Sequence, residues 1–320
     1  MLINIVLIVV GVVMVLKGAD LLTKGGADLA RRMNVSELVV GLTIVAAGTS
    51  APELFVSLVS ALKGTPDLAV GNVVGSNIMN TLVIVGVTAM VAPIAISRQT
   101  VIKDMPFTVV ASVLLMVLAL DRFQSFSLWG NVISRIDGLL LLLGFAAFMY
   151  YTFSVARKGD AEEMSAEEKL RINVWLCLLL IVAGLALLVV GSELFVRNAS
   201  ALAGALGVSE SVIGLTIVAG GTSLPELATS IVAAHKGQSA MAIGNVIGSN
   251  VFNILLILGL TATVCPMQIG GITMVDMSML LVSMLLLWLF SFTKLKVERW
   301  EGAVLTALYL GYLAWLLYNV

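Results

Sequence analysis

Two short motifs place carboxylates in apolar surroundings. The string GTSAPE ends at Glu53 and returns as GTSLPE ending at Glu226, and both copies lie in stretches apolar enough to be membrane helices. An ionisable side chain inside a membrane costs roughly 2.5 to 3.5 kcal/mol on insertion scales, so it persists mainly where a cation, a pore or a partner compensates it. No lysine or arginine lies within either motif, which argues against a structural ion pair. The duplicated carboxylates therefore indicate a cation site.

The residues that precede each glutamate offer only oxygen ligands. Pro52 and Pro225 have no N–H, and a proline ring displaces the carbonyl four residues earlier, which predicts freed carbonyls around residues 46–48 and 219–221. Four hydroxyls stand beside them, those of Thr49, Ser50, Thr222 and Ser223. Such a set suits a hard cation such as Ca2+ or Na+. Zinc and copper sites favour histidine and cysteine, which neither motif contains.

A second duplicated motif supplies neutral oxygens. GNVVGSNIMN spans residues 71–80 and GNVIGSNVFN spans residues 244–253. We interpret Asn80 and Asn253 as ligands or as support for ligands, because intramembrane polar groups are functional more often than not. Four further asparagines could equally bridge helices by hydrogen bonds: Asn72, Asn77, Asn245 and Asn250.

The two motif pairs belong to a long internal repeat. The offset is constant, since 226 minus 53 and 253 minus 80 both equal 173. Weaker echoes in the flanking spans, such as Gly18 and Asp20 against Gly191 and Glu193, make the repeating unit five spans long. An odd number of crossings inverts the second copy relative to the first. The symmetry should bring Glu53 and Glu226 together at mid-depth, with alternating access as the natural mechanism.

Composition indicates an integral membrane protein. The 320 residues are 60% hydrophobic and only 12% charged, whereas a soluble domain is about a quarter charged. Apolar runs of about 20 residues, enough to cross a bilayer core of about 30 Å, lie near residues 2–27, 36–62, 68–92, 101–120, 136–156, 172–203, 209–235, 241–264, 273–293 and 301–319. The predicted fold is all-α, with ten transmembrane helices in two inverted five-helix repeats, 1–156 and 172–320, joined by a cytoplasmic linker, 157–171.

The breaks between spans predict orientation. Because lysine and arginine are retained in cytoplasmic loops, the richer side should face the cytoplasm and both termini should lie outside a cell (inner or plasma) membrane. The richer side holds Lys24, Arg31, Arg32, Arg98, Lys103, Arg157, Lys158, Lys169, Arg171, Lys236, Lys294, Lys296 and Arg299, and the other holds Lys63, Arg122, Arg135 and Arg197. No basic arm suggests nucleic-acid binding. The partners expected are the lipid bilayer and small cations, with a monomer as the default.

GTSxPE with GNxxGSN, present twice in a five-plus-five arrangement, resembles the calcium:cation antiporter superfamily, specifically its prokaryotic sodium/calcium exchanger branch. The resemblance covers essentially the whole chain. It implies exchange of Na+ for Ca2+ by alternating access, with spans 1 and 6 sliding across the other eight, and no resident cofactor. Carried over by position, the implied ligands are the carbonyls of Ala46 and Ala219 and the side chains of Thr49, Ser50, Glu53, Ser76, Asn80, Thr222, Ser223, Glu226, Ser249 and Asn253.

One position departs from that family. At Asn253 the archaeal exchanger of the family and its potassium-dependent branch carry an aspartate, so this chain offers two central carboxylates where those offer three. A Ca2+/H+ or other cation/proton antiporter therefore stays open as the alternative. A channel has no use for matched inverted carboxylates. A serine hydrolase would need a base beside Ser50 or Ser223, and the lone His235 lies off both motifs, so we do not expect an enzyme.

Overall fold

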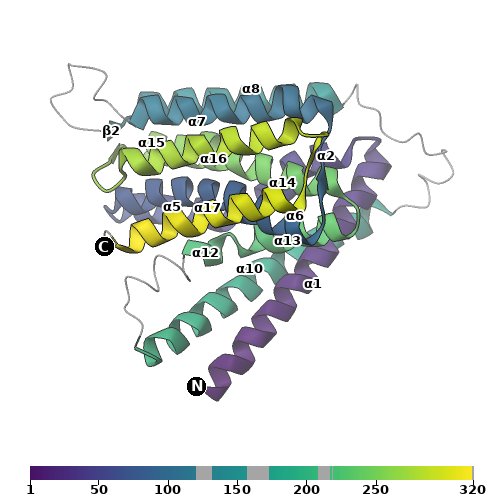
Figure 1. Cartoon of the computed structure of the whole chain (residues 1–320), viewed down its shortest axis with the longest axis horizontal. Coiled ribbons are helices and arrows are strands. Elements are labelled where there is room, and N and C mark those ends of the chain that lie inside the picture. The colour runs from purple at the N-terminus through teal and green to yellow at the C-terminus, as the bar shows by residue number, and fades with distance from the viewer. Residues whose placement is uncertain (120–131, 157–172, 208–216, 218, 319–320) are drawn as a thin grey trace.

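The computed structural model describes residues 1–119, 132–156, 173–207, 217 and 219–318. Helices dominate it (Figure 1). The first half contains α1 (Leu2–Met33), α2 (Glu37–Val40), η1 (Gly41–Val45), α3 (Ala46–Thr49), α4 (Ala51–Leu62), α5 (Pro66–Met79), η2 (Asn80–Ile84), α6 (Val85–Val91), η3 (Thr100–Asp104), α7 (Met105–Ala119) and α8 (Arg135–Ala156). The second contains α10 (Val174–Ala205), α12 (Ala219–Thr222), α13 (Leu224–His235), α14 (Ser239–Val251), η6 (Phe252–Ile257), α15 (Leu258–Val264), α16 (Met274–Phe292) and α17 (Arg299–Tyr318).

The all-α membrane class is confirmed. Within the described residues, eight helices are long and apolar enough to cross a membrane, and the bent pair α2 to α4 makes a ninth if it counts as one span. All nine coincide with predicted spans. The seventh predicted span, 209–235, lies partly outside the described residues, and its second half forms α12 and α13. The predicted linker at 157–171 lies outside them too, so the count of ten stays a prediction.

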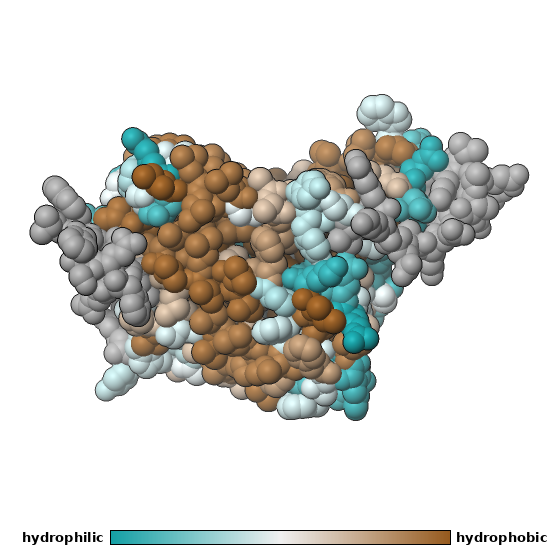
Figure 2. Space-filling model, turned by 90° about the horizontal axis from the view of Figure 1, so that it is seen from above, coloured by the Kyte–Doolittle hydropathy of each residue, from teal (hydrophilic) through white to brown (hydrophobic). Residues whose placement is uncertain are grey.

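The distribution of polar residues is the reverse of that in a soluble protein. Large apolar side chains are exposed on the outer helices, for example Trp175 at 80% and Leu143 at 68%. Seen from above, the surface carries a broad apolar face with hydrophilic residues toward its margins (Figure 2). The interior holds buried glutamates, asparagines and hydroxyls. An apolar exterior suits a lipid environment, and the buried polar groups mark the functional region.

Helices α1 and α10 form a pair that slants against the rest of the bundle (Figure 1). Glycine lets the two backbones approach closely: a Cβ on Gly18 would lie 2.7 Å from the carbonyl oxygen of Gly184, and one on Gly11 would lie 2.8 Å from that of Gly191. These contacts are equivalent under the repeat, because Gly11 corresponds to Gly184 and Gly18 to Gly191 at the offset of 173. Small residues of this kind let membrane helices pack tightly without large side chains between them.

Two short antiparallel strand pairs tie the halves together. Strand β1 (Ile94–Ala95) pairs with β4 (Lys296–Val297), and β2 (Val132–Ile133) pairs with β3 (Met267–Gln268). Each pair joins the strand after the third span of one half to the strand before the fifth span of the other. Strand β2 lies at the end of the bundle where α17 finishes, whereas β4 lies where α17 begins (Figure 1). The pairs therefore occupy opposite ends, as two inverted halves require.

Candidate cation site

The two glutamates stand at breaks in matching helices. Helix α3 ends at Thr49, Ser50 leaves helical geometry, and α4 restarts at Ala51 with Pro52 in its first turn. The helix axis bends by 45° at this point. Residues 219–235 repeat the pattern, with α12 ending at Thr222 and α13 restarting at Leu224 before Pro225. Proline fits a first helical turn because its missing N–H would have no partner there.

Each break brings its glutamate to the hydroxyl of the opposite half. Ser50 Oγ donates to Oε1 of Glu226 at 3.2 Å, and Ser223 Oγ donates to Oε1 of Glu53 at 3.4 Å. Both carboxylates are fully buried, at 0% exposure for Glu53 and 1% for Glu226. Within the described chain, the Oε2 atom of each glutamate has no hydrogen-bond partner. The predicted meeting of the two motifs is thus confirmed, and each carboxylate keeps one oxygen for a ligand.

The carbonyl of Ala46 differs from the prediction. It accepts the backbone N–H of Ser50 at 3.0 Å and lies 3.4 Å from the hydroxyl of Thr49, so the proline does not leave it free. The reason is position, since Pro52 is four residues after Gly48 and the missing N–H affects that carbonyl instead. A carbonyl oxygen has two lone pairs. In the second half, Ala219 begins α12.

Two asparagines brace the glutamate-bearing helices. Asn72 donates to the carbonyl of Glu53 at 3.2 Å and to Ser57 Oγ at 3.0 Å. Asn245, its counterpart, donates to the carbonyl of Glu226 at 3.3 Å and to Ser230 Oγ at 3.0 Å. Sequence alone left these residues open between packing and ligation, and the structure shows the bridging role.

Thr49 of the first half forms a hydrogen bond with Asn245 of the second half. Its hydroxyl donates to Oδ1 of Asn245 at 3.2 Å. The first motif of one half is therefore connected to the second motif of the other. Thr222, the counterpart of Thr49, lies at the end of α12 and lines a cavity on the other side.

The predicted asparagine ligands begin π-helical turns that sequence reasoning missed. Asn80 opens η2 and Asn253 lies at the start of η6, and π-turns of this kind occur frequently at functional sites. Both side chains are buried, at 1% exposure for Asn80 and 0% for Asn253. Among the described residues, Oδ1 of Asn80, the whole amide of Asn253 and Oγ of Ser249 have no hydrogen-bond partner. Ser76, 4% exposed, lines a separate cavity of about 250 Å³ with Tyr309 and Tyr312.

The cluster can therefore hold a hard cation. Buried polar atoms without partners are rare and costly, and here such carboxylate, amide and hydroxyl atoms lie on the two motifs of each half, where α4 packs against η6 and α13 against η2. No group of three or more histidine, cysteine, aspartate or glutamate side chains that could hold a metal ion occurs in the described part of the chain. The donor set suits Na+ or Ca2+ and differs from the nitrogen and sulfur sets of transition metals.

A cavity reaches one edge of the site, at the end of α12, while Glu53 and Glu226 themselves are buried. The cavity, of about 370 Å³, leads to Gly221 and Thr222. Its walls come from α4, α10 and α12, namely Ala51, Pro52, Phe55, Val56, Val189, Ser192, Glu193, Val196, Gly221 and Thr222. We refer to this as the Glu193 side.

The equivalent region of the other half has a smaller cavity of about 150 Å³, lined in part by the counterpart residues Leu16, Leu224 and Ala228. Phe55 is 70% exposed, whereas its counterpart Ala228 is 6% exposed. Thr23, the counterpart of Val196, is completely buried. The residue types differ at both pairs of positions, so side-chain size and polarity as well as the packing of α1 and α10 distinguish the two regions. We refer to this equivalent region as the Asp20 side.

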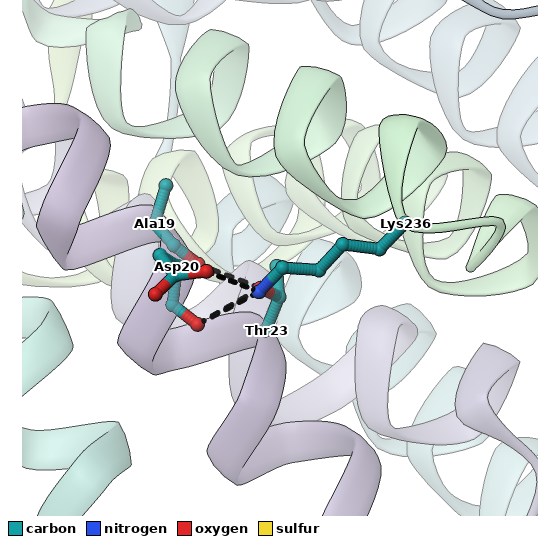
Figure 3. A network of polar contacts seen from close by, with 4 residues as sticks. All are labelled: Ala19, Asp20, Thr23 and Lys236. Atoms are coloured by element: carbon teal, nitrogen blue, oxygen red, sulfur yellow. Dashed lines mark hydrogen bonds and ion pairs between the residues drawn. The ribbon is translucent and has the colours of Figure 1, made fainter.

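An ion pair lies on the Asp20 side. Lys236, just after α13, lies 2.6 Å from the carboxylate of Asp20 and donates to Thr23 Oγ1 at 3.0 Å and to the carbonyl of Asp20 at 3.1 Å (Figure 3). The counterparts of Lys236 and Asp20 are Lys63 and Glu193. These two are exposed and form no ion pair in the part of the chain that the structure describes.

Comparison with known proteins places the chain in a family. The family model described as sodium/calcium exchanger protein matches residues 3–154 and 176–318. The putative antiporter CaxA of Alkalimonas amylolytica is 37% identical over 98% of both chains, and the sodium/calcium exchanger MaX1 of Methanosarcina acetivorans is 31% identical over 99% of both. The solved sodium-calcium exchanger NCX_Mj superposes with a TM-score of 0.84 at 33% identity, covering 98% of both chains. The chain therefore belongs to the sodium/calcium exchanger protein family.

Proposed function

We propose that this protein is a secondary active antiporter that exchanges Na+ for Ca2+ across the cell membrane by alternating access. The observation that carries the proposal is the buried cluster of oxygens without protein partners around Glu53 and Glu226. The names of MaX1 and NCX_Mj as sodium/calcium exchangers support the choice of ions. The cations are transported substrates, held by the twelve residues that the family resemblance implies, from Ala46 to Asn253.

The charge of the site sets what it can carry. Two carboxylates balance one Ca2+ or two Na+, and these loads compete for the same oxygens. A further Na+ would have to be held by neutral oxygens at greater electrostatic cost. Competition for one set of ligands couples the two ions, because the site can change its access from one side of the membrane to the other with either load bound.

Alternating access follows from the two sides of the site. The larger cavity lies on the Glu193 side, and a smaller one lies in the equivalent region on the Asp20 side. Movement of the α1 and α10 pair against the rest would exchange these states. The halves at 1–156 and 172–320 are the two inverted repeats, with the linker at 157–171 in the cytoplasm. The excess of lysine and arginine in one set of breaks supports an orientation with both termini outside.

The decisive test is Ca2+ uptake into proteoliposomes loaded with Na+, compared with liposomes loaded with choline, with the proton gradient clamped. Uptake that requires internal Na+ is the expected result. Uptake indifferent to Na+ but driven by an imposed pH gradient would contradict the proposal. It would favour a cation/proton antiporter, the alternative that the absence of a third carboxylate at Asn253 keeps open.

Acid pH should weaken uptake. Cations bind the ionised carboxylates, and a proton on either glutamate removes half of the site's negative charge, so protons compete with the cation. The apparent Ca2+ affinity should fall as the pH is lowered from about 8 to about 5. Initial rates of Na+-driven uptake at several Ca2+ concentrations measure this fall. An affinity that is constant over this range would show that protons do not compete.

Replacing Lys236 by methionine should shift the balance between the two access states. The ion pair with Asp20 is partly exposed, with side-chain exposures of 30% and 49%, and a pair of this kind contributes at most about 1 kcal/mol, or roughly fivefold in an equilibrium. Because the pair links α1 to the end of α13 on the Asp20 side, its loss should depopulate the arrangement in which the larger cavity lies on the Glu193 side. Maleimide labelling of Ala51→Cys, which lines the cavity, should slow by up to about fivefold.

The matched control is Lys63→Met. Lys63 occupies the equivalent position and pairs with no acid in the described residues, so its loss should not slow labelling. Cys177 and Cys265 are free thiols and are replaced by alanine throughout. Equal labelling rates with and without the Lys236→Met change would show that the ion pair does not distinguish the states.

A further inference from the structure

The amide of Asn80 has one orientation in the site. Its Nδ2 donates to Oδ1 of Asn250 at 3.1 Å, while its own Oδ1 is buried without a partner in the described residues. A cation is attracted to the oxygen of an amide and repelled by its NH2 group. The direction of this amide therefore decides whether Asn80 can serve the site, and the direction must come from its neighbour.

Asn250 is itself held in one direction. Its Nδ2 lies 3.0 Å from Thr81 Oγ1 and 3.4 Å from the sulfur of Met284. The Thr81 hydroxyl in turn lies 2.9 Å from the carbonyl oxygen of Asn77 and 3.2 Å from the same sulfur. A carbonyl oxygen and a thioether sulfur can only accept, so the single hydroxyl proton goes to one of them. Thr81 must then accept a hydrogen from Asn250.

The orientation of the Asn250 amide fixes the orientation of the Asn80 amide. With its NH2 group toward Thr81, Asn250 presents its oxygen to Asn80. Only the NH2 group of Asn80 can meet that oxygen, so the Asn80 oxygen faces away from Asn250. A reversal of either amide would set two oxygens or two NH2 groups against each other in a buried setting, which is costly. The hydroxyl of Thr81 thus orients the amide of Asn80 through the amide of Asn250.

The second half lacks this arrangement. At the offset of 173, Asn253 corresponds to Asn80, Asn77 to Asn250, and Ile254 to Thr81. Isoleucine has no hydroxyl. Both amide atoms of Asn77 and of Asn253 are buried without hydrogen-bond partners among the described residues. The asymmetry is therefore specific: the Asn80 amide is held by neighbours, and the Asn253 amide is not.

We propose that Thr81 and Asn250 are positioning residues that hold the Asn80 oxygen toward the transported cation. The inference rests on the proposed function, since it assigns how one neutral ligand of that site is made ready. A ligand held in its binding orientation loses no rotational freedom when the ion arrives, which favours binding. Asn80 is then the oriented amide ligand, whereas no hydrogen bond among the described residues fixes the direction of the Asn253 amide.

The test compares Thr81→Val, which keeps the shape and removes the hydroxyl, with Thr81→Ser, which keeps the hydroxyl. We expect Thr81→Val to raise the KM for Ca2+ in Na+-driven uptake by roughly fivefold to tenfold, the scale of one lost hydrogen bond. The maximal rate should change little, and Thr81→Ser should retain the KM of the unmodified protein. Ile254→Val, a conservative change at the equivalent position, is the matched control and should have no effect.

A binding measurement separates this inference from the proposed function. The rise in Tm that Ca2+ produces in the purified full-length protein reports binding without transport. Thr81→Val should need a proportionally higher Ca2+ concentration for the same rise. If the unmodified protein fails to exchange Na+ for Ca2+, the proposed function is wrong, and the Tm series still tests the positioning of Asn80.

Two results would overturn the inference. One is a Thr81→Val protein with the Ca2+ KM and Tm response of the unmodified protein. The other is a Thr81→Ser protein as defective as Thr81→Val, because the hydroxyl would then be irrelevant. If Thr81→Val does not fold, Thr81→Ala removes the same hydroxyl without a branched side chain and takes its place.

Discussion

Glu53→Gln and Glu226→Gln should each abolish Na+-driven Ca2+ uptake. Each change removes one unit of negative charge from a buried site while keeping the shape of the side chain. At about 4 Å and an effective dielectric constant of about 20, a unit charge contributes about 4 kcal/mol to the binding free energy of a monovalent cation, which is roughly a thousandfold in affinity. The contribution to the binding of Ca2+ is larger. Initial uptake rates in proteoliposomes measure the loss.

The buried position of the two side chains makes this effect large. Each glutamate accepts one serine hydroxyl from the opposite half and keeps its other oxygen unpartnered within the described residues. A glutamine would keep the hydroxyl contact, so the fold should survive and the Tm should change little. Glu298→Gln, at a glutamate held by Lys294 and Lys296 in the segment before α17, is the control and should transport normally. Uptake above about a tenth of the unmodified rate in either site variant would show that the paired carboxylates are not the centre of the site.

Asn253→Asp should bind Ca2+ more tightly and transport it more slowly. The new carboxylate faces the same cation, so its attraction is of the order of that from each glutamate, reduced by repulsion among three acids. We expect the KM for Ca2+ to fall at least about tenfold, with a lower maximal rate because the ion leaves slowly. Uptake at a series of Ca2+ concentrations, with the charge moved per Ca2+, tests both effects.

Asn80→Asp is the matched comparison. The Asn253 amide has no hydrogen-bond partner in the described chain, so a carboxylate there breaks no bond. At Asn80 a carboxylate would face Oδ1 of Asn250, which now accepts from the NH2 group. The same charge should therefore be tolerated at 253 and poorly accommodated at 80. Equal gains in Ca2+ affinity at both positions would contradict the difference that the structure shows.

Several features of the site could be predicted because they depend on local sequence and on the repeat. The apolar runs correctly predicted the nine spans that the described residues contain. They could do so because a chain segment in lipid must form its backbone hydrogen bonds internally, as a helix. The constant offset of 173 predicted that Glu53 and Glu226 would meet. The serine-to-glutamate hydrogen bonds between the halves confirm it.

Other features were missed for physical reasons. The π-turns at Asn80 and Asn253 leave no signal in residue type, because they depend on how neighbouring helices pack. The carbonyl of Ala46 was wrongly expected to be free, since the N–H that Pro52 lacks would have met Gly48, and Ala46 keeps its bond from Ser50.

By itself, the sequence determined the membrane class, the oxygen chemistry of the site and the pairing of its two motifs, because each depends on residue type and spacing. Tertiary structure alone decided which side of the site carries the larger cavity, that Lys236 meets Asp20 while Lys63 and Glu193 stay apart, and that Asn80 is oriented where Asn253 is not. A nearly symmetric sequence permits both arrangements of the two halves. Only the packing of α1 and α10 against the rest selects one of them, since a single molecule cannot adopt both at once.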